Sequence, residues 1–269
     1  MHTHQRPLRI LSVALLCACS AHAGTALRFG PSSDYVTATT DFARRAQSAA
    51  PANASETRWL APFEEEAPII ATSESYAGPT VHGGYEFISD NTHVLLTRQQ
   101  IRERKGRPDS LALQAHSPDS WEGRSLALRG FFLFKQDAFE SEYRAGPFTP
   151  DRLAASWNSY AAGDRRNITG RYVVKIGDSY HISEHSFGMT NSGSDTVPAA
   201  VLATLRWAPY DPVTALDFEQ GRAVFQKLPL IGVTAVGLYF EDDSWTGDNS
   251  ASSPFAMHIE TFTVSGAIH

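Results

Sequence analysis

Acidic and aromatic side chains that could bind a ligand gather near the C-terminus. Asp242, Asp243 and Asp248 surround Trp245 in a polar stretch between two apolar segments. An indole ring can stack on the apolar face of a sugar while neighbouring carboxylates accept hydrogen bonds from its hydroxyl groups. These four residues therefore predict a ligand-binding loop. Ca²⁺, which prefers oxygen ligands, is the alternative to a glycan, although the usual D-x-D-x-D-G spacing is missing. A Trp245 ring folded back into the core is an equally open interpretation.

A second pattern has the order of a zinc-binding motif. His181, Glu184 and His185 form H-x-x-E-H, the inverted zincin sequence. That chemistry requires a helix, in which positions i and i+4 share one face. The segment here follows a Gly177-Asp178 turn and has the composition of a strand, in which two side chains four residues apart are separated by roughly 13 Å. We therefore favour structural or surface histidines over a metal site.

Other catalytic signatures do not stand out in the chain. The sequence contains no P-loop, no G-x-G-x-x-G fingerprint and no G-x-S-x-G nucleophile elbow. With 29 acidic residues, no local motif selects a carboxylate pair for glycoside hydrolysis. We name no catalytic residue and expect no cofactor other than the Ca²⁺ alternative. A glycan-active enzyme would need a groove across one sheet, for which Tyr172, His181 and His185 are the obvious side chains.

The segments that must position these groups have the composition of β-strands. Residues 171–176 and 179–183 predict a hairpin around Gly177-Asp178. Residues 233–240 are apolar on both faces, which predicts a central strand covered on both sides. Further strands are predicted at residues 93–98, 110–115, 125–134, 201–207, 223–226 and 255–265.

Helix signals are sparse. Residues 41–50 predict a short helix, and residues 149–156 fit either a capped helical turn or a strand. Residues 46–80 are small, polar and rich in proline, which predicts a long loop or a pair of loops. We expect an all-β fold: one antiparallel β-sandwich of the jelly-roll kind over residues 24–269, with few short helices and an irregular N-terminal segment over about residues 24–80.

Composition and the N-terminus limit the class of protein. The chain has 269 residues, is 42% hydrophobic and carries a formal net charge of −6, which argues against disorder and against a nucleic-acid-binding domain. Residues 1–23 read as a secretory signal, with an apolar run far shorter than the ~20 residues that a membrane-spanning helix needs. We expect export to the periplasm or the exterior of a bacterium. The alternative is a lipoprotein anchored through Cys19. Removal of the signal would leave no cysteine.

Several apolar segments are similar to those of a known class of module. They are residues 131–137 (FFLFKQD), 171–175 (RYVVK), 180–184 (YHISE), 233–240 (VTAVGLYF) and 259–264 (IETFTV). The series resembles bacterial exported β-sandwich modules of the galactose-binding-like, jelly-roll kind. The resemblance implies that fold and glycan binding, but it transfers no ligand residue because such modules bind through loops.

The sequence supports three hypotheses of function. The first is an exported, non-catalytic protein that binds a polysaccharide or a cell-surface partner. The second is a glycan-active lyase or hydrolase on a β-sandwich. The third is a structural protein of the cell envelope.

Overall fold

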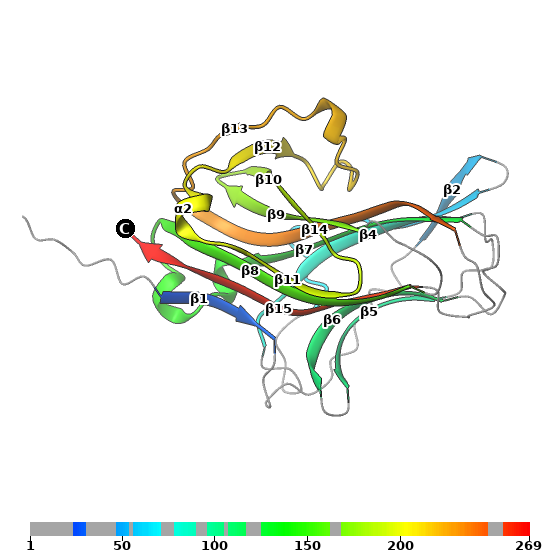
Figure 1. The fold of residues 1–269 in the computed structure, drawn as a ribbon, viewed down its shortest axis with the longest axis horizontal. Helices are drawn as coiled ribbons and strands as arrows, with labels where there is room; N and C mark the ends of the chain where they lie inside the picture. The colour runs from blue at the N-terminus through cyan, green and yellow to red at the C-terminus, as the bar shows by residue number, and fades with distance from the viewer. Residues whose placement is uncertain are drawn as a thin grey trace, which may run out of the picture.

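The computed structural model describes residues 24–30, 47–53, 56–70, 78–89, 96–104, 107–116, 125–161, 168–246 and 255–269. Two antiparallel sheets built from these residues pack against each other as a β-sandwich with few short helices (Figure 1). The predicted all-β sandwich is therefore confirmed. The predicted signal, Cys19 and Asp248 lie outside the described residues. No helix in the described part of the chain is long and apolar enough to cross a membrane.

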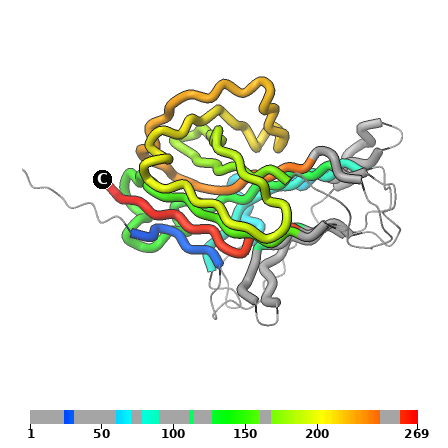
Figure 2. Tube along the Cα trace, viewed as in Figure 1, coloured from blue at the N-terminus to red at the C-terminus, as the bar shows by residue number. Residues whose placement is uncertain are grey.

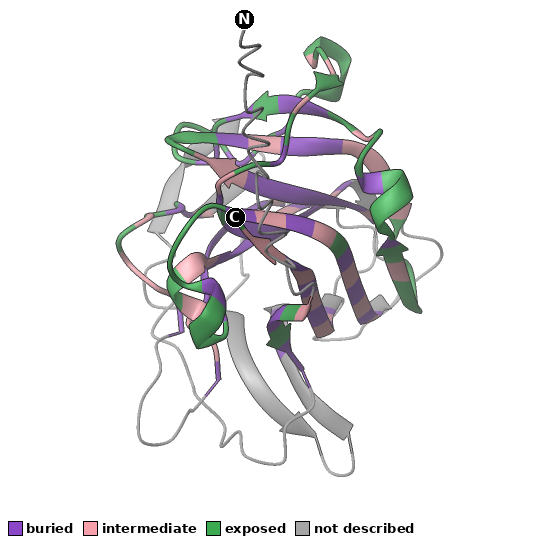
Figure 3. Cartoon of the chain, turned by 90° about the vertical axis from the view of Figure 1, so that its left-hand side faces the viewer, coloured by how far each residue is buried: buried purple, intermediate pink, exposed green. Residues whose placement is uncertain are grey.

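The smaller sheet has the strand order β11-β8-β15-β6-β5, with β1 also paired to β15. Its strands are β1 (Gly24–Phe29), β5 (Leu96–Arg104), β6 (Arg107–His116), β8 (Phe148–Ala161), β11 (Ser192–Val197) and β15 (Phe255–Ile268). Buried and less buried side chains alternate along β8 and β15 (Figure 3). This alternation is typical of a sheet with one face on the core.

The larger sheet has the order β13-β12-β10-β9-β14-β7-β4-β3-β2. Its strands are β2 (Gln47–Asn53), β3 (Glu56–Ala61), β4 (His82–Ser89), β7 (Ser125–Lys135), β9 (Thr169–Ile176), β10 (Ser179–Gly188), β12 (Arg206–Tyr210), β13 (Gln226–Lys227) and β14 (Val233–Thr246). The short helices are η1 (Gln136–Ala138), η2 (Ser141–Tyr143), α2 (Ala199–Leu202) and η3 (Gln220–Arg222).

The larger sheet is covered on both faces. Its inner face packs on the smaller sheet through side chains such as Val236, Leu238 and Phe240 of β14. Its outer face carries a second apolar cluster, to which β14 contributes Ala235 and Tyr239. The prediction of a central strand with two covered faces is therefore confirmed for residues 233–240.

A polar segment folds back over that outer face. Residues 211–225, which we call the strap, follow β12 and arch over the sheet (Figure 2). The strap contributes Leu216 and Phe218 to the outer cluster, and Phe63 joins the cluster from the loop after β3. The edge of Phe63 meets the ring of Phe131 at a centroid distance of 5.0 Å. Two connections therefore shield one face of the larger sheet.

The predicted hairpin is present. Strands β9 and β10 pair around Gly177, which has a φ of 57°. A positive φ costs glycine little because it has no Cβ, so this residue type suits the tight turn. The segment that carries H-x-x-E-H is a strand, as predicted.

Other predicted elements need correction. Residues 201–207 are not one strand: α2 begins after Pro198, and β12 starts only at Arg206. The alanine and leucine residues of α2 favour helix over the single β-branched Val201. The predicted strand 223–226 is mostly irregular and reaches β13 only at Gln226.

The N-terminal third is more regular than predicted. The expected loop over residues 46–80 contains the paired strands β2 and β3. Residues 47–50 of the expected helix belong to β2, and residues 41–46 lie outside the described residues. Of the two alternatives for residues 149–156, the strand is correct, because β8 is held between β15 and β11.

Candidate ligand-binding site

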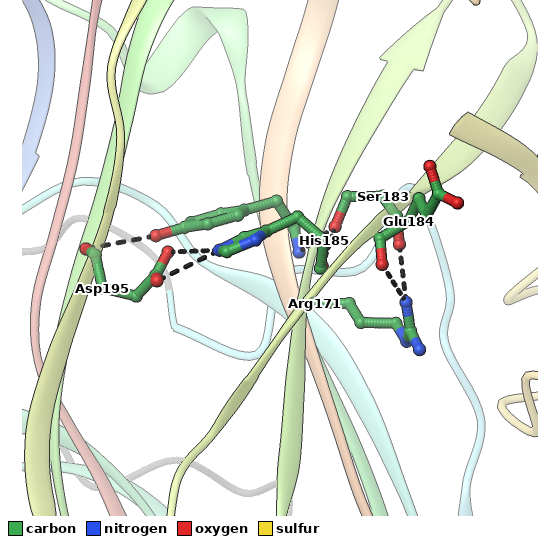
Figure 4. Close-up of polar contacts among 6 residues, drawn as sticks. Arg171, Ser183, Glu184, His185 and Asp195 are labelled. Atoms are coloured by element: carbon green, nitrogen blue, oxygen red, sulfur yellow. Dashed lines mark hydrogen bonds and ion pairs between the residues drawn. The ribbon is translucent and has the colours of Figure 1, made fainter. Parts of the chain in front are cut away.

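A bulge in β10 directs side chains to both faces of the larger sheet. Ile182 of β10 pairs with Val173 of β9, whereas Ser186 pairs with Arg171. The residues between them on β10, 183–185, therefore lie opposite Tyr172 alone. Bulges of this kind re-aim side chains next to the sheet. Figure 4 shows the result, with His185 and Arg171 reaching away from each other.

The inner side of the bulge connects the two sheets. The Nε2 atom of His185 on β10 lies 3.0 Å from each carboxylate oxygen of Asp195 on β11 (Figure 4). The ring of Tyr172 stacks on the imidazole at an interplanar angle of 9°, and its hydroxyl donates to the Asp195 carbonyl at 3.3 Å. Burial, together with the charge of Asp195, raises the pKa of Tyr172 well above its ordinary range.

These residues have the types of a serine hydrolase triad but the wrong geometry. The Ser183 hydroxyl donates to the His185 carbonyl at 2.6 Å and accepts from the Tyr172 N–H at 3.1 Å. In a triad, one imidazole nitrogen faces the serine while the acid holds the other. Here the acid occupies Nε2, and Ser183 is fully buried. The arrangement therefore stabilises the sandwich.

The H-x-x-E-H residues lie on strand β10 and not on a helix. Among the described residues, no group of three or more His, Cys, Asp or Glu side chains could hold a metal ion. His181 is half-buried, and burial lowers its pKa. His181 and His185 are both partly buried on β10.

The outer side of the bulge holds a buried cation. Arg171 is 2% exposed, and its Nη1 donates to the carbonyls of Ser183 and Glu184, each at 2.9 Å (Figure 4). The guanidinium carbon lies 5.6 Å from the ring centroid of Phe218 and 5.9 Å from that of Phe225. Both rings belong to the strap. The bulge thus fixes Arg171, and Arg171 supports the strap.

Next to Arg171, a tyrosine joins the sheet to the strap. The hydroxyl of Tyr239 on β14 donates to Glu241 at 2.7 Å and accepts from the Phe218 N–H at 3.3 Å. Burial and the charge of Glu241 raise the pKa of Tyr239 well above its ordinary range. Burial lowers the pKa of Arg171 overall, although the charge of Glu241 partly offsets this effect. Because the pKa of Tyr239 is raised, its hydroxyl stays protonated at neutral pH.

A third contact ties the strap to the sheet through charge. Arg129 of β7 pairs with Glu86 of β4 at 3.1 Å and with Asp217 of the strap at 3.3 Å. Glu86 is almost fully buried, whereas the Asp217 side chain is 44% exposed. Asp217 is therefore held in place while one side of it faces solvent.

These contacts shape a pocket between β12 and the strap, with a volume of about 310 Å³. Its apolar wall includes Pro209, Ala215 and Ala223. Its aromatic and charged lining residues are Tyr210, Asp211, Asp217, Phe218, Glu219 and Arg222. Aromatic surface and hydrogen-bonding groups thus converge on one concave region.

The polar groups of the pocket are organised by the strap itself. Asp211 accepts from the Thr214 hydroxyl at 2.6 Å and from the N–H groups of Val213 and Thr214. The Thr214 hydroxyl lowers the pKa of Asp211 most, against a smaller opposing effect of burial. Glu219 accepts from Arg222 at 2.6 Å. Asp211 and Glu219 are therefore both oriented by neighbouring groups of the strap.

The predicted site residues lie elsewhere. The stretch after residue 240 is not a loop at first, because β14 continues to Thr246. Asp242 is 2% exposed on that strand. Asp243 and Trp245 also belong to β14, Trp245 pairing with Leu126, but their side chains are outside the described residues, as is all of Asp248. The prediction that these four residues bind a ligand is untested.

The pocket is a site that the sequence analysis missed. The only local signal for it is Tyr210-Asp211-Pro212, an aromatic residue followed by a turn sequence at the end of a strand. The implied likeness to galactose-binding-like modules remains a prediction beyond the β-sandwich itself. Comparison of the chain with family models, with curated proteins and with solved structures finds no match.

Proposed function

We propose that this protein binds a carbohydrate without acting on it, and that the pocket under the strap holds the sugar. The observation that carries the proposal is the gathering of three acids, Asp211, Asp217 and Glu219, in one open pocket whose lining includes the largely buried rings of Tyr210 and Phe218. Carboxylates accept hydrogen bonds from the hydroxyl groups of a sugar, and the ring atoms that line the pocket add apolar contact.

The size and preorganisation of the pocket support this proposal. Small-molecule sites usually have volumes of roughly 300–1,000 Å³. At about 310 Å³, the pocket suits a mono- or disaccharide unit at the end or side of a longer glycan. Because Asp211 and Glu219 are already held by neighbours on the strap, little conformational entropy is lost when they meet a ligand.

The electrostatics of the pocket favour binding over catalysis. A glycosidase needs one carboxyl group with a raised pKa as its general acid. The Asp211 pKa is lowered instead. A lyase would need a base, yet burial and nearby acids raise the pKa of Tyr210, the tyrosine that lines the pocket. Its hydroxyl stays protonated and donates to the Leu216 carbonyl at 3.0 Å.

Export remains part of the proposal. The signal predicted from residues 1–23 would place the protein in the periplasm or outside the cell, where polysaccharides and cell-surface glycans are its natural partners. Anchoring through Cys19 is compatible with the same role.

A glycan array with the purified chain and two variants tests the proposal. Ala215→Trp places an indole in the pocket, whereas Ala200→Trp adds the same group at an exposed position on α2. We expect the wild type and Ala200→Trp to bind the same glycans and Ala215→Trp to lose them. Equal binding by all three proteins would exclude this pocket. No binding on a broad array would favour a structural role.

A further inference from the structure

The pocket carries an excess of negative charge. Three of its lining residues are acidic, Asp211, Asp217 and Glu219, and one is basic, Arg222. Arg222 is already bonded to Glu219. Arg129, behind the pocket, is shared between Asp217 and Glu86, and Arg171, behind Phe218, interacts with Glu241, so neither cation serves the lining acids alone.

The buried tyrosine in the pocket wall registers the same excess. Burial raises the pKa of Tyr210 most, and Glu241, Asp217 and Asp211 raise it further, whereas Arg129 alone opposes them. Three carboxylates and one guanidinium therefore act on one hydroxyl group at the pocket wall. This potential would repel a ligand anion and attract a ligand cation.

Resting on the proposed function, we propose that the pocket selects glycans by charge: it prefers an amino sugar with a free ammonium group and rejects sugars that carry carboxylates or sulfates. The ammonium group lies among the strap acids Asp211, Asp217 and Glu219.

Three oligosaccharides of equal length test the selection: a β-1,4-glucosamine oligomer, its N-acetylated counterpart and a galacturonate oligomer. Calorimetric titration of the purified chain at low ionic strength gives their affinities. We expect the glucosamine oligomer to bind about five-fold more tightly than the acetylated one, the upper end of what partly exposed charge pairs contribute. The galacturonate should not bind. At about 1 M salt, where the Debye length is only ~3 Å, the preference should vanish.

A matched pair of charge reversals locates the effect. Glu219, which precedes η3, and Glu142, within η2, are both exposed acids, but only Glu219 lines the pocket. Glu219→Lys should abolish the preference for glucosamine, and Glu142→Lys should leave it unchanged. A comparable loss in both variants would overturn the assignment to this pocket.

The outcomes separate this inference from the proposed function. Galacturonate binding at least as tight as glucosamine binding, blocked by Ala215→Trp, would overturn charge selection and leave the sugar pocket standing. Equal affinity for the glucosamine and acetylated oligomers at low salt would also overturn it. Absence of binding to every glycan on a broad array would overturn both proposals.

Discussion

The guanidinium of Arg171 lies beneath the ring of Phe218, 5.6 Å from its centroid. Arg171 comes from the larger sheet, and Phe218 comes from the strap and forms one wall of the pocket. The bulge in β10 supplies the two carbonyl groups that orient the guanidinium. An irregularity inside the sheet thus determines the position of a residue in the candidate site.

Replacement of that arginine should weaken the fold and the pocket together. Arg171→Lys keeps a positive charge but loses the planar group that contacts two carbonyls and two rings. We expect urea denaturation to show a loss of about 2–3 kcal/mol in the free energy of unfolding, because buried carbonyls lose their donors. Arg152→Lys, at an exposed position on β8, should change it by less than about 0.5 kcal/mol. Equal effects would contradict the role of Arg171.

The contact between His185 and Asp195 should hold the edge strand β11 against the rest of the sandwich. Asp195→Ala removes the acceptor of a partly buried hydrogen bond, for which we expect a cost of about 1–2 kcal/mol. Hydrogen exchange should speed up in Ser192–Val197 but not in β9. Asp137→Ala, an exposed aspartate of η1, is the control. Unchanged exchange in β11 would show that the contact is dispensable.

Stability should fall in acid through Glu65. This carboxylate accepts hydrogen bonds from Lys175 and from the Tyr180 hydroxyl. Burial raises its pKa, but these bonds and the lysine charges outweigh burial and lower it overall. Because the folded pKa lies below the unfolded value of about 4.3, the contribution is complete above that value and disappears as the pH falls through the folded pKa.

A pH series of unfolding free energies checks this linkage. Glu65→Gln should flatten the decrease in stability below about pH 5 relative to the wild type. Glu140→Gln, at an exposed position before η2, should leave the profile unchanged. A profile for Glu65→Gln that matches the wild type would refute the contribution of Glu65.

Close packing in the central strand should make Gly237 irreplaceable. A Cβ at this position would lie 2.0 Å from the carbonyl oxygen of Phe132 on the neighbouring strand β7. Forcing the strands apart should cost about 1–3 kcal/mol or more in Gly237→Ala. Gly221→Ala in η3 meets no atom within 4 Å and should be nearly neutral. Thermal unfolding of the two variants compares them directly.

Local patterns predicted the parts of the fold that depend on local chemistry. The hairpin of β9 and β10 has its turn residues and alternating strands within a short stretch, and β14 shows its two apolar faces directly. The end of β14 could not be predicted in the same way. Glu241 looks like a loop residue in sequence, but it pairs in the sheet with Arg129, a residue remote in the chain.

The pocket depended even more on distant contacts. No local pattern in the strap reveals that Asp217 meets Arg129 or that Phe218 lies on Arg171. Asp217 and Phe218 of the strap meet Arg129 and Arg171 of the sheet only when the sheet has formed. The H-x-x-E-H pattern was interpreted correctly as a strand because its turn and composition are local.

The most direct test of the sugar pocket is the map of amide chemical shift changes when the tightest-binding glycan saturates the protein. We expect changes in amide chemical shift centred on residues 209–223, and we expect the same glycan to cause none in Ala215→Trp. Changes confined to residues 242–248, with the strap unaffected, would contradict it and would place binding at the acidic segment first singled out in the sequence.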